Sequence, residues 1–193
     1  MIIKDGEYAD IPTPTGPMRL HLFRPVAAGR YPGILLYSEI YQITGPIRRM
    51  AALLAGQGYL VAAPEVYHEF EKPGTVLAYD PAGTDRGNDL KITKEVSAFD
   101  SDARAGLDFM AQHECCTGRL GVMGICRGGH LAFRAAMNRM CWPQPASMQP
   151  TSTTTSSAST MPTTVSRGPA ASRANSCASG VGRTRMSHSK AAS

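Results

Sequence analysis

The sequence lacks any apolar run approaching the ~18 residues that a membrane-spanning helix needs, so no membrane partner is expected. Its start, Met1 to Asp5, lacks the basic and apolar regions of a secretory signal peptide. Its five cysteines form an odd set without metal-ligand spacing, which argues against a disulfide framework and against a structural zinc site. We therefore expect a protein of the reducing cytoplasm that uses no metal and no cofactor.

Acidic residues are absent after Glu114, and this absence explains the net charge of +5. Residues 1–141 carry equal numbers of acidic and basic side chains, whereas residues 142–193 carry only basic ones. The positive charge therefore belongs to the end of the chain rather than to one face of a folded domain. The charges there are few and widely spaced, so no nucleic-acid partner is expected.

Apolar residues also become scarce after residue 141. Residues 142–193 contain no Leu, Ile, Phe or Tyr and are rich in Ser, Thr, Ala and Pro. Such a segment cannot bury enough apolar surface to offset the ~1–2 kcal/mol per residue that ordering its backbone costs. We expect one α/β domain over residues 1–141 and a disordered tail over residues 142–193.

Short apolar runs alternate with amphipathic segments in the first part of the chain. The runs predict strands, the amphipathic segments predict helices, and a long connection joins two of these elements. The predicted strands are 18–24 (an edge strand), 33–37, 59–63 and 120–124; the predicted helices are 46–56, 92–112 and 128–139; the connection is 64–90. Helical crossovers between apolar strands indicate a mainly parallel sheet flanked by helices. Sites in such sheets form at the carboxyl ends of the strands, here at Ser38-Glu39, at Pro64-Glu65 and after Gly124.

The segment Gly124-Ile125-Cys126-Arg127-Gly128-Gly129 lies between a predicted strand and a predicted helix. In that context, G-x-C-x-G is the pattern of a nucleophile elbow with Cys in place of Ser. Gly124 and Gly128 leave room for a sharp turn, and the adjacent helix start favours a thiolate. The N–H of Arg127 is placed to donate to an oxyanion. The alternative is a buried structural Cys before a Gly-rich helix; a P-loop is disfavoured because its Lys-Ser/Thr pair is absent.

Four stretches together resemble the dienelactone hydrolases, also called carboxymethylenebutenolidases. They are the elbow segment 121–132, the Glu-Ile-Tyr stretch 36–41, the Gly-Tyr…Pro-Glu-Val-Tyr stretch 57–67, and the helix start 99–104. Their order and spacing agree with the family over residues 6–139. The resemblance implies an α/β-hydrolase fold. It also implies a small-molecule substrate, an enol lactone such as those from aromatic ring cleavage, or another carboxylic ester.

The resemblance implies roles for individual residues. Cys126 would be the nucleophile that forms a thioester acyl-enzyme. The backbone N–H groups of Ile40 and Arg127 would form the oxyanion hole, and Glu39 would approach the thiol and help to set its protonation. Arg86 could hold a substrate carboxylate, although a surface salt bridge explains it equally well. A solvated loop carboxylate is the alternative for Glu39.

The remaining reactive side chains are expected to be structural. His113-Glu114-Cys115-Cys116 is predicted to be a helix end and a loop rather than a metal site or a vicinal disulfide. His130 is expected within a helix, and His68 in a loop rather than facing the cleft. Cys141 and Cys177 have no predicted partner.

The family pattern is incomplete in this sequence. The triad of an α/β-hydrolase runs nucleophile, acid, His, but no acidic residue follows Glu114 and the only His beyond the elbow helix is His188. We assign neither a triad Asp nor a triad His, and we expect the C-terminal strands and helices to be missing. An out-of-frame tail after residue 141 is our hypothesis, with a sequencing error, a pseudogene or a short isoform as alternatives.

Three other functions stay open at this point. The first is a truncated product of a dienelactone hydrolase gene with little or no activity. The second is a nucleic-acid-binding protein that uses its basic tail, and the third is a redox role for Cys115-Cys116 or for Cys126. The oligomeric state is not determined by the sequence.

Overall fold

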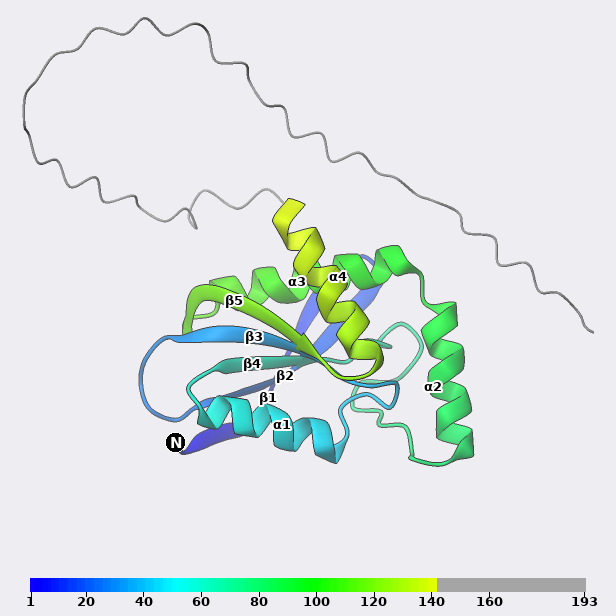
Figure 1. The fold of residues 1–193 in the computed structure, drawn as a ribbon, viewed down its shortest axis with the longest axis horizontal. Coiled ribbons are helices and arrows are strands. Elements are labelled where there is room, and N and C mark those ends of the chain that lie inside the picture. Colours follow the sequence, from blue (N-terminus) through cyan, green and yellow to red (C-terminus); the bar gives the residue numbers. More distant parts are fainter. Residues whose placement is uncertain (142–193) are drawn as a thin grey trace, which may run out of the picture. The chain divides into compact units, whose positions relative to one another are not determined.

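A computed structural model describes residues 1–141 of the chain, with the side chains of residues 1–138. The described part contains five strands and four helices, and after the first two strands each strand is followed by one helix or, after β4, by two (Figure 1). In chain order they are β1 Ile3–Thr13, β2 Gly16–Pro25, β3 Tyr31–Tyr37, α1 Gly45–Gly56, β4 Leu60–Pro64, α2 Pro81–Thr93, α3 Val96–Gln112, β5 Cys116–Gly124 and α4 Arg127–Cys141. The fold is α/β, as predicted.

The strands form one sheet in the order β1-β2-β4-β3-β5. β3 pairs in parallel with both β4 and β5, whereas β2 pairs antiparallel with β1 and with β4. Because β3, β4 and β5 run in the same direction, their carboxyl ends meet at one edge of the sheet. The three polar segments predicted from the sequence follow these ends.

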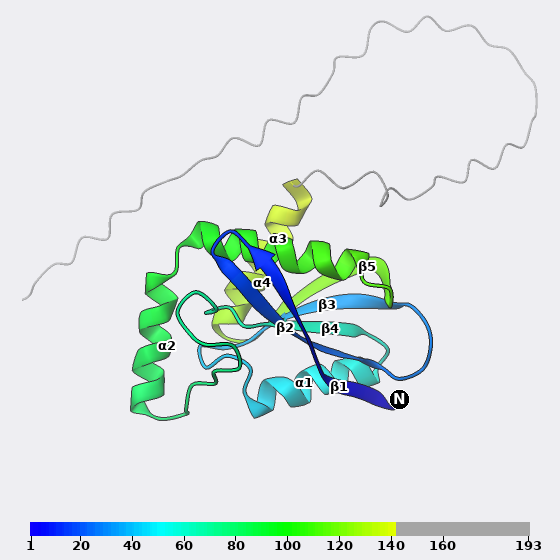
Figure 2. The ribbon, with the colours of Figure 1, turned by 180° about the vertical axis from the view of Figure 1, so that it is seen from behind.

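Helices cover both faces of the sheet (Figures 1 and 2). On one face, α1 packs Ile47, Ala51 and Ala55 against side chains such as Phe23 and Leu36. On the other face, α3 and α4 cover an apolar cluster whose members come from every strand of the sheet. β4 and most of β3 are therefore buried on both sides, which is why their sequences show no alternation, whereas most residues of β5 alternate between half-buried and exposed. No helix among residues 1–141 is long and apolar enough to cross a membrane.

Two predictions about the strands were wrong. Residues 18–24 belong to β2, which is not an edge strand, because β1 pairs along its outer side. Sequence reasoning missed β1 since most of its residues are polar or exposed and it contains Gly6 and Pro12. β5 begins at Cys116 rather than at residue 120.

Two predictions about the region between β4 and β5 were also wrong. Residues 64–90 are not all connection, because α2 occupies their last part. This helix has little apolar character; its N-terminus is capped by Asp80, whose carboxylate accepts from the Gly83 N–H at 2.7 Å. The helix predicted at 92–112 begins at Val96, because the extended backbone of Lys94 separates it from α2.

Candidate active site

Cys126 lies in the turn between β5 and α4 with a backbone φ of 53°. Residues other than glycine rarely adopt this conformation, and such strain is concentrated at functional sites. Backbone hydrogen bonds hold the turn: the Ile125 N–H donates to the Tyr37 carbonyl at 3.2 Å, and the Gly129 N–H donates to the Cys126 carbonyl at 3.0 Å. The structure thus places an exposed, unbridged cysteine on a sharp strand-to-helix turn.

Two glycines allow this turn to close. A Cβ on Gly124 would lie 2.0 Å from the carbonyl oxygen of Gly128, and a Cβ on Gly128 would lie 2.5 Å from the carbonyl oxygens of Tyr37 and Ser38. All three carbonyls belong to backbone, so neither clash could be relieved by a side-chain rotation. The second contact also places the start of α4 against the end of β3. Cys126 is therefore close to the segment that follows β3.

The two backbone donors predicted for an oxyanion hole lie in these neighbouring segments. Arg127 is the first residue of α4, and the N–H groups in the first turn of a helix have no acceptor within the helix. Ile40 lies in the turn after β3, and its carbonyl oxygen would be 2.8 Å from a Cβ on Gly87 in α2. That close backbone contact restrains the turn. The roles of Ile40 and Arg127 stay predictions.

The side chain of Arg127 is directed toward the junction of α2 and α3. Its guanidinium carbon lies 5.2 Å from the ring centre of Phe99, and Nη2 donates to the carbonyl of Lys91 at 3.3 Å. Near it, burial raises the pKa of Tyr67 to about 12; the charge of Arg127 lowers this pKa, and charge on Cys126 raises it. Tyr67 is thus a neutral hydroxyl close to both residues, which sequence reasoning did not single out.

Glu39 is held by two hydroxyl groups from different segments. Thr44 Oγ1 donates to Glu39 Oε1 at 2.9 Å, and the Tyr79 hydroxyl donates to the same oxygen at 2.5 Å. The Tyr79 hydroxyl also lies 3.1 Å from Thr44 Oγ1. The carboxylate is therefore part of a small network, in contrast to the freely solvated loop carboxylate that was its alternative. Its action on the thiol stays a prediction.

Arg86 lies on α2 and is exposed. Its Nη2 is 2.7 Å from Glu71 Oε1, and its Nε donates to the same oxygen at 2.8 Å. This is the surface ion pair that the sequence left open as the alternative reading. Substrate binding by Arg86 stays a prediction that this contact does not favour.

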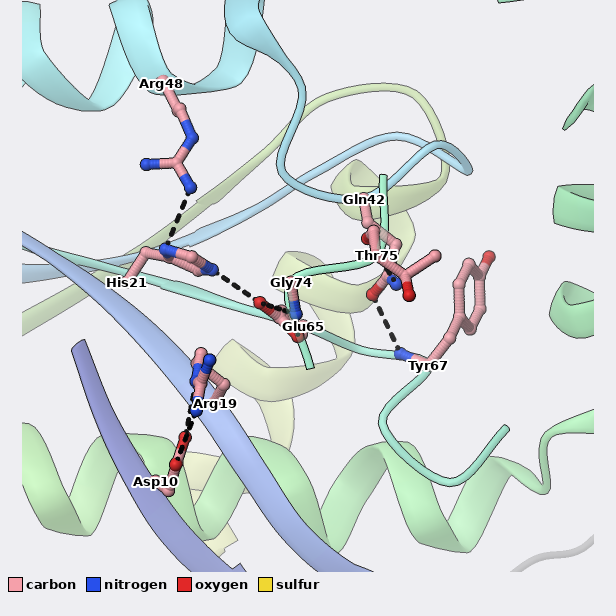
Figure 3. A network of polar contacts seen from close by, with 9 residues as sticks. All are labelled: Asp10, Arg19, His21, Gln42, Arg48, Glu65, Tyr67, Gly74 and Thr75. Atoms are coloured by element: carbon pink, nitrogen blue, oxygen red, sulfur yellow. Dashed lines mark hydrogen bonds and ion pairs between the residues drawn. The ribbon is translucent and has the colours of Figure 1, made fainter. Parts of the chain in front are cut away.

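A buried carboxylate at the end of β4 anchors the segment that follows. Glu65 accepts from the Gly74 N–H at 2.9 and 3.0 Å, and its Oε1 lies 2.6 Å from Nε2 of His21 (Figure 3). The other ring nitrogen of His21 is 3.2 Å from Arg48 Nη2. We call His21, Arg48, Glu65 and Gly74 the Glu65 cluster. Sequence reasoning placed Glu65 at a strand end but could not identify its partners, which are distant in sequence.

A second buried cluster joins α2, α3 and the segment after β4. Asp102 Oδ2 lies 2.6 Å from Lys94 Nζ and 3.1 Å from His68 Nε2, and Lys94 Nζ is 2.5 Å from Glu69 Oε1. Burial raises the pKa of Asp102, but the His68 hydrogen bond and the charge of Lys94 outweigh it, so the pKa lies below its usual value. We call these four residues the Asp102 cluster.

The Asp102 cluster does not suit a metal ion. His68, Glu69 and Asp102 each offer a ligand atom, and these atoms lie within 4.8 Å of one another. The ammonium group of Lys94, which is completely buried, already contacts both carboxylates. A cation added there would be repelled by this charge, so we interpret the cluster as an ion-pair network. His68 is accordingly a residue of the loop region, as predicted.

The other reactive residues lie where the sequence placed them, except that Cys116 is the buried first residue of β5 rather than part of a loop. His113 follows the end of α3, Cys115 and Cys116 are unbridged, and His130 lies in α4. The predicted tail 142–193, with Cys177 and His188, lies outside the described residues, as does the side chain of Cys141.

Comparisons with known proteins identify the family of this chain. The sequence profile of the "Dienelactone hydrolase family" matches residues 18–158. A Saccharomyces cerevisiae protein named "Putative carboxymethylenebutenolidase" is 43% identical over 138 residues, which are 68% of this chain and 50% of that protein. The carboxymethylenebutenolidase of Pseudomonas sp. strain P51 is 29% identical over 119 residues, 60% of this chain and 48% of that protein.

A solved structure shows the same fold. The crystal structure titled "Putative Dienelactone Hydrolase" from Klebsiella pneumoniae superposes with a TM-score of 0.60 at 26% identity, over 70% of this chain and 55% of that chain. The chain therefore spans about half the length of the curated and solved relatives it matches.

Proposed function

Because the chain belongs to the dienelactone hydrolase family, we propose that it acts on an enol lactone or another carboxylic ester through Cys126. The single observation that supports this most is the backbone of Cys126. An exposed thiol at φ 53°, directly before a helix, is the arrangement that presents a nucleophile and favours its thiolate. A structural cysteine would have no need of this strained conformation.

The proposed reaction begins with attack of the Cys126 sulfur on the carbonyl carbon, while the thiol proton passes to Glu39. The N–H groups of Ile40 and Arg127 stabilise the negative oxygen of the tetrahedral intermediate. The carbon–oxygen ester bond then breaks, the enol oxygen leaves with the proton that Glu39 had accepted, and a thioester remains on Cys126. Water hydrolyses the thioester, releases the carboxylate product and restores the thiol. No cofactor takes part in these steps.

The second stage needs a base that activates water. In the described part of the chain, the buried imidazoles are engaged elsewhere: His21 contacts Glu65 and Arg48, and His68 contacts Asp102. We therefore propose that the 193-residue chain acylates faster than it deacylates. This corresponds to the alternative function, a truncated hydrolase with little turnover.

The outer edge of β5 supports that alternative. In the described residues β5 is the last strand of the sheet, and an apolar groove of about 400 Å³ lined by Ile34, Leu120 and Val122 runs beside it. Apolar surface beside a parallel strand is usually covered in a complete domain. The cytoplasmic location belongs to the same proposal, since a reducing compartment keeps a reactive thiol from oxidation.

The test is to mix the chain with p-nitrophenyl acetate and to follow both p-nitrophenolate release and the mass of the intact protein. We expect one acetyl group per chain, located on Cys126, and a burst followed by slow release. Cys126→Ala should abolish the adduct. Cys115→Ser is the matched control, because it removes a half-buried cysteine, and it should leave the adduct unchanged.

Two results would contradict these proposals separately. Acylation that survives Cys126→Ala would overturn the nucleophile assignment. Steady turnover of many cycles per minute that depends on Cys126 would support the hydrolase and overturn the truncated alternative.

A further inference from the structure

The segment after β4 contributes a side chain to the surroundings of Glu39. Tyr79 donates to Glu39 Oε1 at 2.5 Å across 40 residues of sequence, while Thr44 donates to the same oxygen at 2.9 Å. Hydrogen bonds to an ionised carboxylate are about twice as strong as those between neutral groups. Both donors use Oε1, so Oε2 is the oxygen that this pair leaves for another proton.

Buried contacts fix the two segments against each other. The side chain of Gln42, whose own backbone has a φ of 68°, donates through Nε2 to the Thr75 carbonyl at 3.1 Å and accepts from the Tyr67 N–H at 3.3 Å. Figure 3 shows Gln42 beside Thr75 and joined by a hydrogen bond to the backbone of Tyr67. Two residues closer to Tyr79, the Leu77 N–H donates to the Tyr41 carbonyl at 3.1 Å.

Tyr79 is held in the orientation that reaches Glu39. Its ring packs on the ring of Tyr41 with the centres 4.5 Å apart, and the Tyr41 hydroxyl is bonded to Thr84 Oγ1 at 2.9 Å. Tyr79 is nevertheless 61% exposed, so the apolar core does not require it. We therefore interpret this exposed ring, which packs on Tyr41 and donates to a carboxylate, as part of the candidate active site rather than of the apolar core.

We propose that Tyr79, together with Thr44, is a positioning residue that holds Glu39 through Oε1 and thereby presents Oε2 to the thiol of Cys126. This inference rests on the proposed function and adds a residue to it. Partial desolvation and the bond to Glu39 raise the pKa of Tyr79, which keeps its hydroxyl protonated as a donor. A carboxylate held in this position accepts the thiol proton as the sulfur attacks the substrate.

The test is the pH dependence of Cys126 alkylation by iodoacetamide, followed by the mass of the intact chain from pH 6 to pH 10. Tyr79→Phe removes the donor and keeps the ring. We expect alkylation at pH 7 to be roughly tenfold slower than in the wild type, because a proton acceptor that is displaced from the thiol loses rate. Faster alkylation would show instead that the bond only weakens Glu39 as a proton acceptor, and it would overturn the positioning role. At pH 10 the rates should converge, because hydroxide then removes the proton without Glu39.

Three further variants complete the design. Glu39→Gln should give the same loss at pH 7 or a larger one, and Thr44→Val should shift the profile in the same direction. Tyr8→Phe is the matched control: it removes the hydroxyl of another exposed tyrosine, on β1, and it should leave the profile unchanged. Cys115, Cys141 and Cys177 are replaced by Ser in every variant, so that Cys126 and the buried Cys116 are the cysteines that remain.

The possible results distinguish the positioning role of Tyr79 from the proposed roles of Glu39 and Cys126. If Tyr79→Phe overlays the wild type while Glu39→Gln is slow, the positioning role is overturned and Glu39 keeps its role. If the pH profile of Glu39→Gln also matches that of the wild type, the proton transfer to Glu39 is overturned. Acylation of Cys126 is tested independently, by the acetyl group that p-nitrophenyl acetate leaves on it. An equal slowing at every pH would indicate a general structural effect and would overturn the positioning role too.

Discussion

The elbow at residues 124–128 and the segment 65–80 both begin at the carboxyl ends of strands parallel to β3, but they are held differently. The elbow depends on backbone shape: glycines and a positive φ let three backbone carbonyls approach closely. The segment 65–80 depends on buried charge, through the Glu65 and Asp102 clusters. We therefore expect the stability of the elbow to be independent of pH and to fall when an atom is added to one of its glycines. The stability of the segment 65–80 should instead depend on the protonation of its buried carboxylates.

The largest effect is expected at the elbow. Gly124→Ala adds a Cβ that would lie 2.0 Å from the Gly128 carbonyl oxygen, so the turn cannot close without moving α4. We expect a loss of about 4 kcal/mol in the free energy of unfolding, measured by urea denaturation, with the same value at pH 5 and pH 8.

Gly121→Ala is the control for this experiment. It lies in the same strand, its Cβ would meet nothing closer than 4.0 Å, and it should change stability by less than about 1 kcal/mol. Equal losses for the two substitutions would show that backbone shape at the elbow is not the cause.

Removal of the carboxylate from the Asp102 cluster should have the next largest effect. Asp102→Asn leaves the fully buried Lys94 with Glu69 as its remaining anion, and breaking a buried ion pair costs about 3 kcal/mol. The pKa of Asp102 is lowered in the folded protein, so its contribution is complete above the unfolded value of ~3.9 and is lost as pH falls through the folded value.

The difference in the free energy of unfolding between the wild type and Asp102→Asn should therefore be largest at pH 7 and should decrease below about pH 4. Asp108→Asn is the matched control, because Asp108 is an exposed aspartate on the same helix. A gap that stays constant down to pH 2 would contradict the assignment of this stability to the ionised carboxylate.

A smaller and more local effect is expected in the Glu65 cluster. Glu65→Gln keeps one oxygen for the Gly74 N–H but loses the charge opposite His21, at a cost of about 2 kcal/mol. Amide hydrogen exchange should accelerate in residues 65–80 more than at the elbow. Equal acceleration in both regions would show that the two halves of the site are not held separately.

The smallest effect is expected for an ion pair on the outer hairpin. Hydrogen bonds from Arg24 and Lys4 lower the pKa of Glu7 from 4.5 to about 2, although burial opposes them. Its contribution should be present above pH ~4.5 and lost toward pH ~2, but it is partly exposed, so Glu7→Gln should cost only about 0.5 kcal/mol at pH 7. If Glu7→Gln lowered the free energy of unfolding as much as Asp102→Asn, burial would not explain why one ion pair stabilises the protein more than the other.

Local signals in the sequence determined several features of this protein. The apolar runs predicted β3, β4 and the second half of β5, and Pro46 and Gly56 marked the limits of α1. The G-x-C-x-G segment predicted the elbow, because the small residues that the turn needs lie close to the nucleophile in the sequence. The order of four short motifs was sufficient to indicate the family, which the comparisons confirm.

Only the tertiary structure decided the rest. β1 and α2 have too little apolar periodicity to be predicted, and they form because β2 and the segment after β4 provide partners for them. Glu39, Thr44 and Tyr79 meet across 40 residues, and Asp102 meets His68 across 34, so no local pattern indicates these contacts. Backbone geometry depends on neighbouring residues and can be inferred from the sequence. The partners of a buried charge depend on how the chain packs, and they emerge only once the fold has formed.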